Sequence, residues 1–102
     1  MEYYLTVRAT IELFKTERSG KVGSYQSGVR PNHYFQGSRS YAAGEVKFLG
    51  NESLAPGEVC DAEVSFLLDS SECETPKEGT TWEIREGQRI VGSGTILSIL
   101  GS

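Results

Sequence analysis

The chain has 102 residues, the size of one domain, and a formal net charge of −4 at pH 7. Its 37% of hydrophobic residues, 24% of charged residues and 12 glycines exclude a collagen, a coiled coil and an acidic disordered chain. No apolar run approaches the ~20 residues of a membrane helix, and residues 1–4 lack the basic start of a secretion signal. We therefore expect a single cytoplasmic domain covering residues 1–102.

The first half of the chain predicts one long strand and several short ones. Residues 5–13 alternate apolar and polar side chains without interruption, which is typical of a strand with one buried face. Residues 16–20 break the pattern and predict a turn or loop, followed by a Gly/Ser-rich link. Pro31 then precedes a short aromatic strand at 33–35, and another short strand is expected at 45–49.

The second half contains a second long strand and a hairpin. A Pro-Gly turn at 55–57 is followed by alternating residues 60–68, which predict a half-buried strand. Residues 69–79 form an acidic segment without periodicity, so we expect a loop. Residues 82–85 and 89–100 predict two strands joined by a tight turn that contains a glycine.

These elements indicate an all-β protein. Five to seven strands with regular turns favour an antiparallel sandwich or a closed β-barrel. Gly92 and Gly94 are spaced two apart on one face of the last strand, where glycine commonly marks a bend or a close backbone approach. Trp82 is more simply explained as a core residue than as a functional one.

Charge and cysteine content limit the possible functions. Residues 1–51 carry seven basic and four acidic side chains, whereas residues 52–102 carry three basic and ten acidic ones. Nucleic-acid binding would therefore need a local basic patch, although chance asymmetry of a solvated surface also explains this distribution. Cys60 is expected in the core and Cys73 on the surface, both reduced; with one histidine they cannot form a four-ligand zinc site. No cofactor or metal is expected.

The sequence gives no support for catalysis. It contains no P-loop, and the Gly92-Ser93-Gly94 cluster lies inside a predicted strand. His33 could act as a general base, but no nucleophile motif accompanies it, so we expect a protein that is not an enzyme. Arg85 and Arg89 flank the predicted turn and could together hold a phosphate, or could instead pair with neighbouring carboxylates.

Three ordered motifs resemble the third domain of bacterial elongation factor Tu. Residues 82–96, Trp-Glu-Ile-Arg-Glu-Gly-Gln-Arg-Ile-Val-Gly-Ser-Gly-Thr-Ile, resemble that family's closing hairpin, in which an aromatic residue precedes x-I-R-E-G-G-R-T-V-G-A-G. Residues 28–35 resemble its G-Y-R-P-Q-F-Y-F, and residues 55–58 resemble its M-P-G-D. The similarity covers about residues 5–100. It implies a six-stranded antiparallel closed β-barrel, and no GTP binding, since the family's GTPase domain has no counterpart in this sequence.

The resemblance also implies a binding surface, because the third domain of the family holds the T-stem of aminoacyl-tRNA and contacts the exchange factor. Arg85, Glu86 and Gly87 match the family's tRNA-contacting hairpin. Lys21 falls where the family has a basic contact, and Asn32 replaces a contacting glutamine. The candidate binding residues, with two further arginines, are Lys21, Arg30, Asn32, Arg85, Glu86, Gly87 and Arg89.

Several departures from the family pattern weaken the expected RNA contacts. Val22 stands where the family has a contacting histidine, and His33 replaces a phenylalanine. The acidic loop 69–79 replaces a short loop that carries a tRNA-facing lysine. Our leading hypothesis is therefore a module that binds a protein partner as a decoy, a regulator or a toxin neutraliser. The alternative is weakened tRNA or other RNA binding through Lys21 and the Arg85–Arg89 hairpin.

Overall fold

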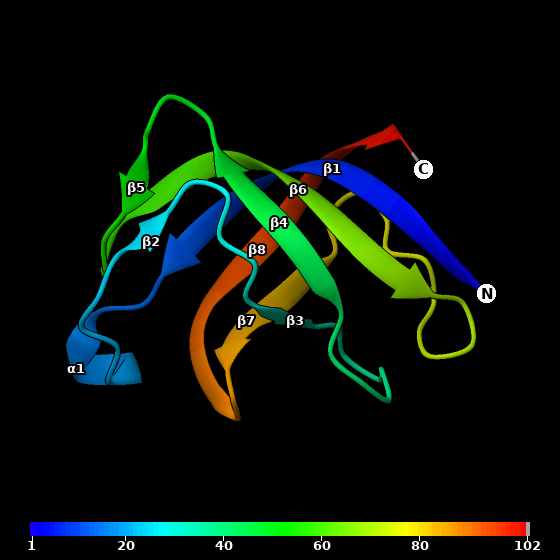
Figure 1. The fold of residues 1–102 in the computed structure, drawn as a ribbon, viewed down its shortest axis with the longest axis horizontal. Helices are drawn as coiled ribbons and strands as arrows, with labels where there is room; N and C mark the ends of the chain where they lie inside the picture. The colour runs from blue at the N-terminus through cyan, green and yellow to red at the C-terminus, as the bar shows by residue number, and fades with distance from the viewer. Residues whose placement is uncertain (102) are drawn as a thin grey trace.

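The computed structural model describes residues 1–101 and consists mainly of antiparallel strands (Figure 1). Within these residues, no helix has the length and apolarity needed to cross a membrane. The elements are β1 (Glu2–Leu13), α1 (Thr16–Ser19), β2 (Tyr25–Gln26), β3 (Asn32–Tyr34), β4 (Ala43–Phe48), β5 (Ser53–Leu54), β6 (Val59–Asp69), β7 (Thr81–Glu86) and β8 (Arg89–Gly101).

Six strands form one curled sheet in the order β3-β7-β8-β1-β6-β4, and β2 pairs with β5 in a small second sheet. The all-β prediction is confirmed, but the prediction of a closed barrel is wrong, since the curled sheet is a half-barrel. The edge strands β3 and β4 form no continuous ladder; isolated bridges join His33 with Ala42, just before β4, and Val29, before β3, with Val46. The reason is the shortness of β3, which follows Pro31, a residue with no N–H to donate to a ladder.

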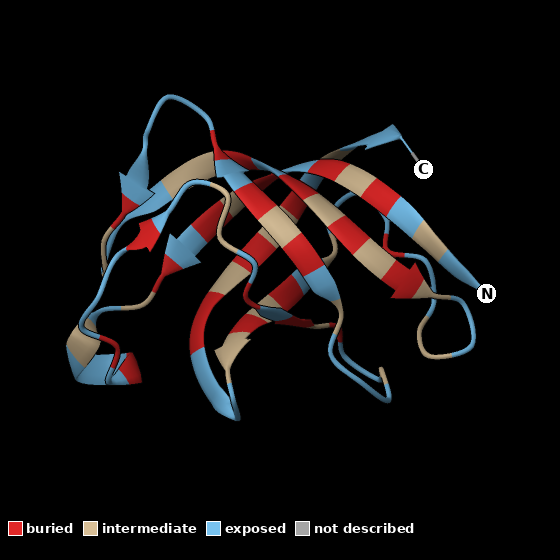
Figure 2. Ribbon diagram, in the orientation of Figure 1, coloured by how far each residue is buried: buried red, intermediate tan, exposed pale blue. Residues whose placement is uncertain are grey.

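Buried residues alternate with exposed or half-buried ones along the long strands (Figure 2), and the buried ones make up the core. Along β1, the buried residues are Leu5, Val7, Ala9, Ile11 and Leu13, and their neighbours are exposed or half-buried. In β6, Ala62 through Leu68 repeat this alternation, directly opposite β1 in register. The period-two pattern in the sequence therefore correctly predicted which face of each strand is buried.

Three short elements lie where the sequence predicted no regular element. Thr16–Ser19 form the one-turn helix α1, which is capped at its end by Gly20 with a left-handed φ of 78° that glycine adopts without steric cost. The Gly/Ser-rich link contains β2, and the segment before the Pro-Gly turn contains β5. One helical turn and two two-residue strands are too short to produce a recognisable period in the sequence.

Trp82 on β7 and Gly94 on the neighbouring strand β8 are directly opposite each other and form a cross-strand pair. The Trp82 side chain is 1% exposed and packs edge-on against Phe66, with ring centroids 5.0 Å apart. A Cβ atom added to Gly94 would lie 2.3 Å from the indole ring. The close approach predicted at Gly92 and Gly94 is confirmed at both: the indole occupies the place of a side chain at Gly94, and a Cβ atom at Gly92 would lie 2.4 Å from the Glu12 carbonyl oxygen.

The last part of β8 is irregular and pairs on one side only. Ser98, Ile99 and Gly101 pair with β1, and the register shifts twice along that ladder, between Thr6 and Val7 and between Arg8 and Ala9, so that Leu97 and Leu100 have no partner on β1. On the other side, β7 pairs only with residues 89–95. Leu97, Ile99 and Leu100 are consequently among the exposed hydrophobic residues.

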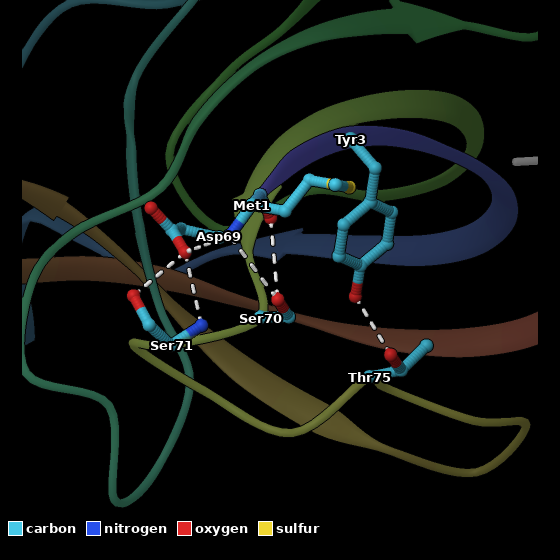
Figure 3. Close-up of polar contacts among 6 residues, drawn as sticks. All are labelled: Met1, Tyr3, Asp69, Ser70, Ser71 and Thr75. Atoms are coloured by element: carbon cyan, nitrogen blue, oxygen red, sulfur yellow. Dashed lines mark hydrogen bonds and ion pairs between the residues drawn. The ribbon is translucent and has the colours of Figure 1, made fainter.

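The acidic loop after β6 is tied to the start of β1 (Figure 3). The Asp69 carboxylate accepts hydrogen bonds from the Ser71 N–H (2.9 Å) and hydroxyl (2.7 Å), and it lies 3.1 Å from the amino group of Met1. These contacts lower the pKa of Asp69 to about 2, with the Ser71 backbone the largest cause. The hydroxyls of Tyr3 and Thr75 are 2.7 Å apart further along the loop. The acidic segment therefore has a defined path.

Both thiols are free and half-buried, so neither cysteine matches its predicted position fully. Cys60 lies near the start of β6 and only partly reaches the core, whereas Cys73 packs against the core from the acidic loop. Cys73 does so because the chain turns back after β6, where its N–H donates to the Asp69 carbonyl oxygen at 3.3 Å.

Candidate functional site

Four of the candidate residues, Arg85, Glu86, Gly87 and Arg89, lie at the turn of the β7–β8 hairpin. Gly87 and Gln88 connect the two strands, and Glu86 pairs with Arg89 in register. Gly87 has a φ of 62°, which favours glycine at this tight turn. The predicted hairpin is therefore confirmed, and its side chains emerge beside the segment that follows α1.

Glu86 is the centre of a charge cluster at the hairpin. The Lys21 ammonium lies 3.0 Å from Glu86 Oε2, and Arg89 donates to Oε1 at 3.1 Å. Lys21 also stacks on the Tyr25 ring, 4.4 Å from its centroid, and its side chain is only 10% exposed. Burial alone would raise the pKa of Glu86, but its donors, Lys21 first, outweigh burial and lower it. Lys21 is thus a partner of the hairpin's own carboxylate.

Arg85 is held by a different set of groups on the outer face of β7. Its guanidinium forms an ion pair and two hydrogen bonds with Glu83, and NH1 donates to the Tyr41 hydroxyl at 3.3 Å. It also lies over the ring of Tyr34, 4.6 Å from the centroid. The two tyrosine rings meet edge to face, with centroids 6.1 Å apart. Of the alternatives for Arg85 and Arg89, the structure therefore has both paired with neighbouring carboxylates.

The other two candidate residues are exposed. Asn32 lies opposite Arg85 in the β3–β7 ladder, whereas Arg30 precedes β3 and makes no ion pair within residues 1–101. The structure thus gathers Lys21, Glu86 and Arg89 in one cluster and places Asn32 beside Arg85. Arg30 remains the one free cation among the candidate residues described.

His33 is enclosed in the core instead of facing a cleft. His33 is 0% exposed. Its Nδ1 accepts a hydrogen bond from Trp82 Nε1 at 2.9 Å, so the ring proton is on Nε2. Nε2 donates this proton to the Gly44 carbonyl oxygen at 3.0 Å. Burial lowers the pKa of His33 to about 4. A Cβ atom at Gly44 would lie 3.1 Å from the imidazole, so glycine leaves room for the ring. His33 is therefore a neutral, fully hydrogen-bonded core residue.

Sequence reasoning missed a hollow on the outer face of β7 and β8, here named the β7–β8 groove. It has a volume of about 570 Å³, and the residues that define it are Phe14, Arg18, Tyr34, Glu83, Arg85 and Ile90. Arg18 stacks on Phe14, 3.7 Å from the ring centroid. Phe14 and Arg18 are four residues apart, a spacing that brings side chains together on a helix. The sequence could have indicated this pair only if the helical turn α1 had been predicted. The groove's other wall, on β3, depends on long-range pairing.

Comparison of the chain with models of known protein families finds no match. No three His, Cys, Asp or Glu side chains between residues 1 and 101 gather closely enough to hold a metal ion. What the arrangement offers chemically is a set of fixed charges and aromatic faces. Such groups suit recognition by ion pairs, stacking and burial of apolar surface.

Proposed function

We propose that the chain is a non-catalytic binding module, similar to the third domain of elongation factor Tu, that engages a protein partner. It would act as a decoy, a regulator or a neutraliser of a toxin that exploits the factor. The observation that carries this proposal is the internal pairing at the hairpin. Lys21 and Arg89 contact Glu86, and Arg85 contacts Glu83, so three of the candidate cations already have carboxylate partners. A polyanion would have to compete with those carboxylates.

Two further features support this function. The acidic loop carries Asp69, Glu72, Glu74 and Glu78, which repel phosphate. His33, the residue on which catalysis was considered, has both ring nitrogens hydrogen-bonded and no exposed surface. The surface therefore offers paired charges and aromatic rings, a composition that suits a protein interface.

Capture from a bacterial lysate tests the proposal when the captured protein is then purified. We expect the immobilised domain to retain a protein in lysate with or without nuclease treatment. The purified partner should bind the domain saturably at one-to-one stoichiometry in calorimetry. Recovery of RNA alone, or loss of the captured protein after nuclease treatment, would contradict a direct protein partner.

The alternative function is weak tRNA or RNA binding, and one observation favours it. Arg30 is exposed without an ion pair in the described chain, close to Asn32 at the start of β3. A single free cation supplies little of the affinity that comes from neutralising several phosphates. We therefore expect at most weak binding that disappears as the salt concentration rises.

The variant Glu86→Gln separates the two functions, because it removes the carboxylate that pairs with Lys21 and Arg89. We expect the wild type to bind tRNA weakly at about 50 mM salt and the variant to bind roughly three- to tenfold more tightly, with a steeper salt dependence. Fluorescence anisotropy with labelled tRNA measures both. Glu52→Gln is a control on an exposed carboxylate that forms no ion pair within residues 1–101. Tight tRNA binding by the wild type would favour the alternative.

A further inference from the structure

We propose that the β7–β8 groove docks an acidic segment of a partner protein, in which an aromatic or large aliphatic side chain lies next to a carboxylate. This inference rests on the proposed protein-binding function and assigns it a surface. The groove is lined by Phe14 and Arg18 on one side and by Tyr34 of β3 on the other. In Figure 1, α1 lies to the left of the β7–β8 hairpin and β3 to its right.

The charges of the groove favour an acidic occupant. Arg18 and Arg85 contribute two positive charges and Glu83 one negative charge, so the groove is positive on a chain whose net charge is −4. Arg85 is paired with Glu83, but the exposed Arg18 makes no ion pair within residues 1–101. Its stacking on Phe14 holds the guanidinium in place while leaving its hydrogen-bonding edge free. One carboxylate can therefore bind to Arg18.

The remaining lining favours an apolar side chain beside that carboxylate. Phe14 and Tyr34 are half-buried, and Ile90 is 38% exposed. These side chains line an open hollow of about 570 Å³, within the range of ligand-binding pockets. A buried aromatic or aliphatic anchor next to one ion pair is a common way for a short segment to gain specificity.

The groove suits a peptide segment better than a nucleic acid. Glu83 lies in the groove and Glu86 at the end of the same strand, and both carboxylates already hold neighbouring cations, so a chain of phosphates would have to displace several ion pairs at once. Of the two arginines in the groove, Arg18 is the one without an ion pair among residues 1–101, and it suffices for a single carboxylate. The backbones of β7 and β8 are paired with each other along the groove, so recognition depends on side chains and not on added strand pairing.

A defined peptide tests this inference by NMR titration of the labelled domain. The probe is the capped peptide Ser-Asp-Phe-Glu-Leu-Ser, and its controls carry lysine in place of both acids or alanine in place of phenylalanine. We expect the acidic probe to bind with a Kd of about 0.1–1 mM and to shift the amide signals of groove residues. Both control peptides should bind at least fivefold more weakly.

Two matched arginine variants locate the binding site. Arg18→Gln should weaken the acidic probe about fivefold, whereas Arg39→Gln, at an exposed arginine outside the groove that forms no ion pair within residues 1–101, should leave its Kd unchanged. Thermal unfolding confirms that both variants stay folded. Equal binding of the lysine peptide, no binding at 5 mM, or an unchanged Kd in Arg18→Gln would overturn the proposal. If a captured partner also binds Arg18→Gln normally, the groove assignment fails while the protein-binding function stands.

Discussion

Gly94→Ala is expected to destabilise the domain by about 3 kcal/mol, because the new methyl group would overlap the buried indole of Trp82. A Cβ atom there would lie 2.3 Å from Trp82 Cη2 and 2.4 Å from Cζ2. The ring cannot move aside easily, since Phe35, Phe66 and His33 surround it with centroids 5.0–6.0 Å away. For a domain of this size the loss corresponds to a decrease in Tm of roughly 15 °C.

Urea denaturation and thermal unfolding measure this effect. Gly101→Ala is the matched control, because Gly101 lies in the same strand with no atom within 4 Å of the added Cβ. The double variant Gly94→Ala/Trp82→Phe should lose less stability than the two single variants together, since the smaller ring leaves room for the methyl group. A loss below about 1 kcal/mol in Gly94→Ala would show that the indole yields more readily than its packing suggests.

Acidification is expected to destabilise the domain through His33 well before the carboxylates are protonated. The pKa of His33 is lowered to about 4 in the folded state, against 6.5 when unfolded. The unfolded chain therefore binds the proton first, and stability present above pH 6.5 is lost progressively as the pH falls toward 4. Linkage gives a loss of about 2 kcal/mol by pH 5 and about 3 kcal/mol by pH 4 from this residue.

His33 is the only histidine in the chain, which makes the measurement specific. The free energy of unfolding from urea titrations should decrease between pH 7 and pH 5, where few carboxylates titrate. His33→Gln should be less stable at pH 7, since the Trp82 N–H and the Gly44 carbonyl lose the ring between them, and its stability should vary little over this pH range. A wild-type stability that stays constant from pH 7 to pH 5 would contradict a buried neutral His33.

The long strands could be predicted because a strand with one buried face has apolar and polar residues in alternation. Residues 5–13 and 60–68 alternate strictly, and β1 and β6 contain them. Closure could not be predicted in the same way, because it depends on how β3 and β4 meet at the far ends of the sheet. The resemblance to the elongation-factor domain implied closure, and this prediction is wrong because β3 is too short to continue the ladder.

The candidate site shows the same limit at the level of single residues. Arg85, Gly87 and Arg89 were placed correctly at a hairpin, because a tight turn is local in sequence. The burial of Lys21 was missed, because its partner Glu86 is distant in the chain and reaches it only through the fold. Ion pairs between residues that are far apart in the chain, such as Lys21 and Glu86, thus could not be predicted from a single sequence.

The irregular end of β8 has a consequence for how the molecule behaves in a crowded solution. A flat, regular strand with the uncharged, apolar sequence of residues 97–101 would serve as a template for fibre growth, in which one molecule adds its strand to the next. The two register shifts against β1 disturb the even spacing that such stacking requires. The domain can therefore keep leucine and isoleucine side chains at its surface without offering neighbouring copies a regular edge on which to polymerise.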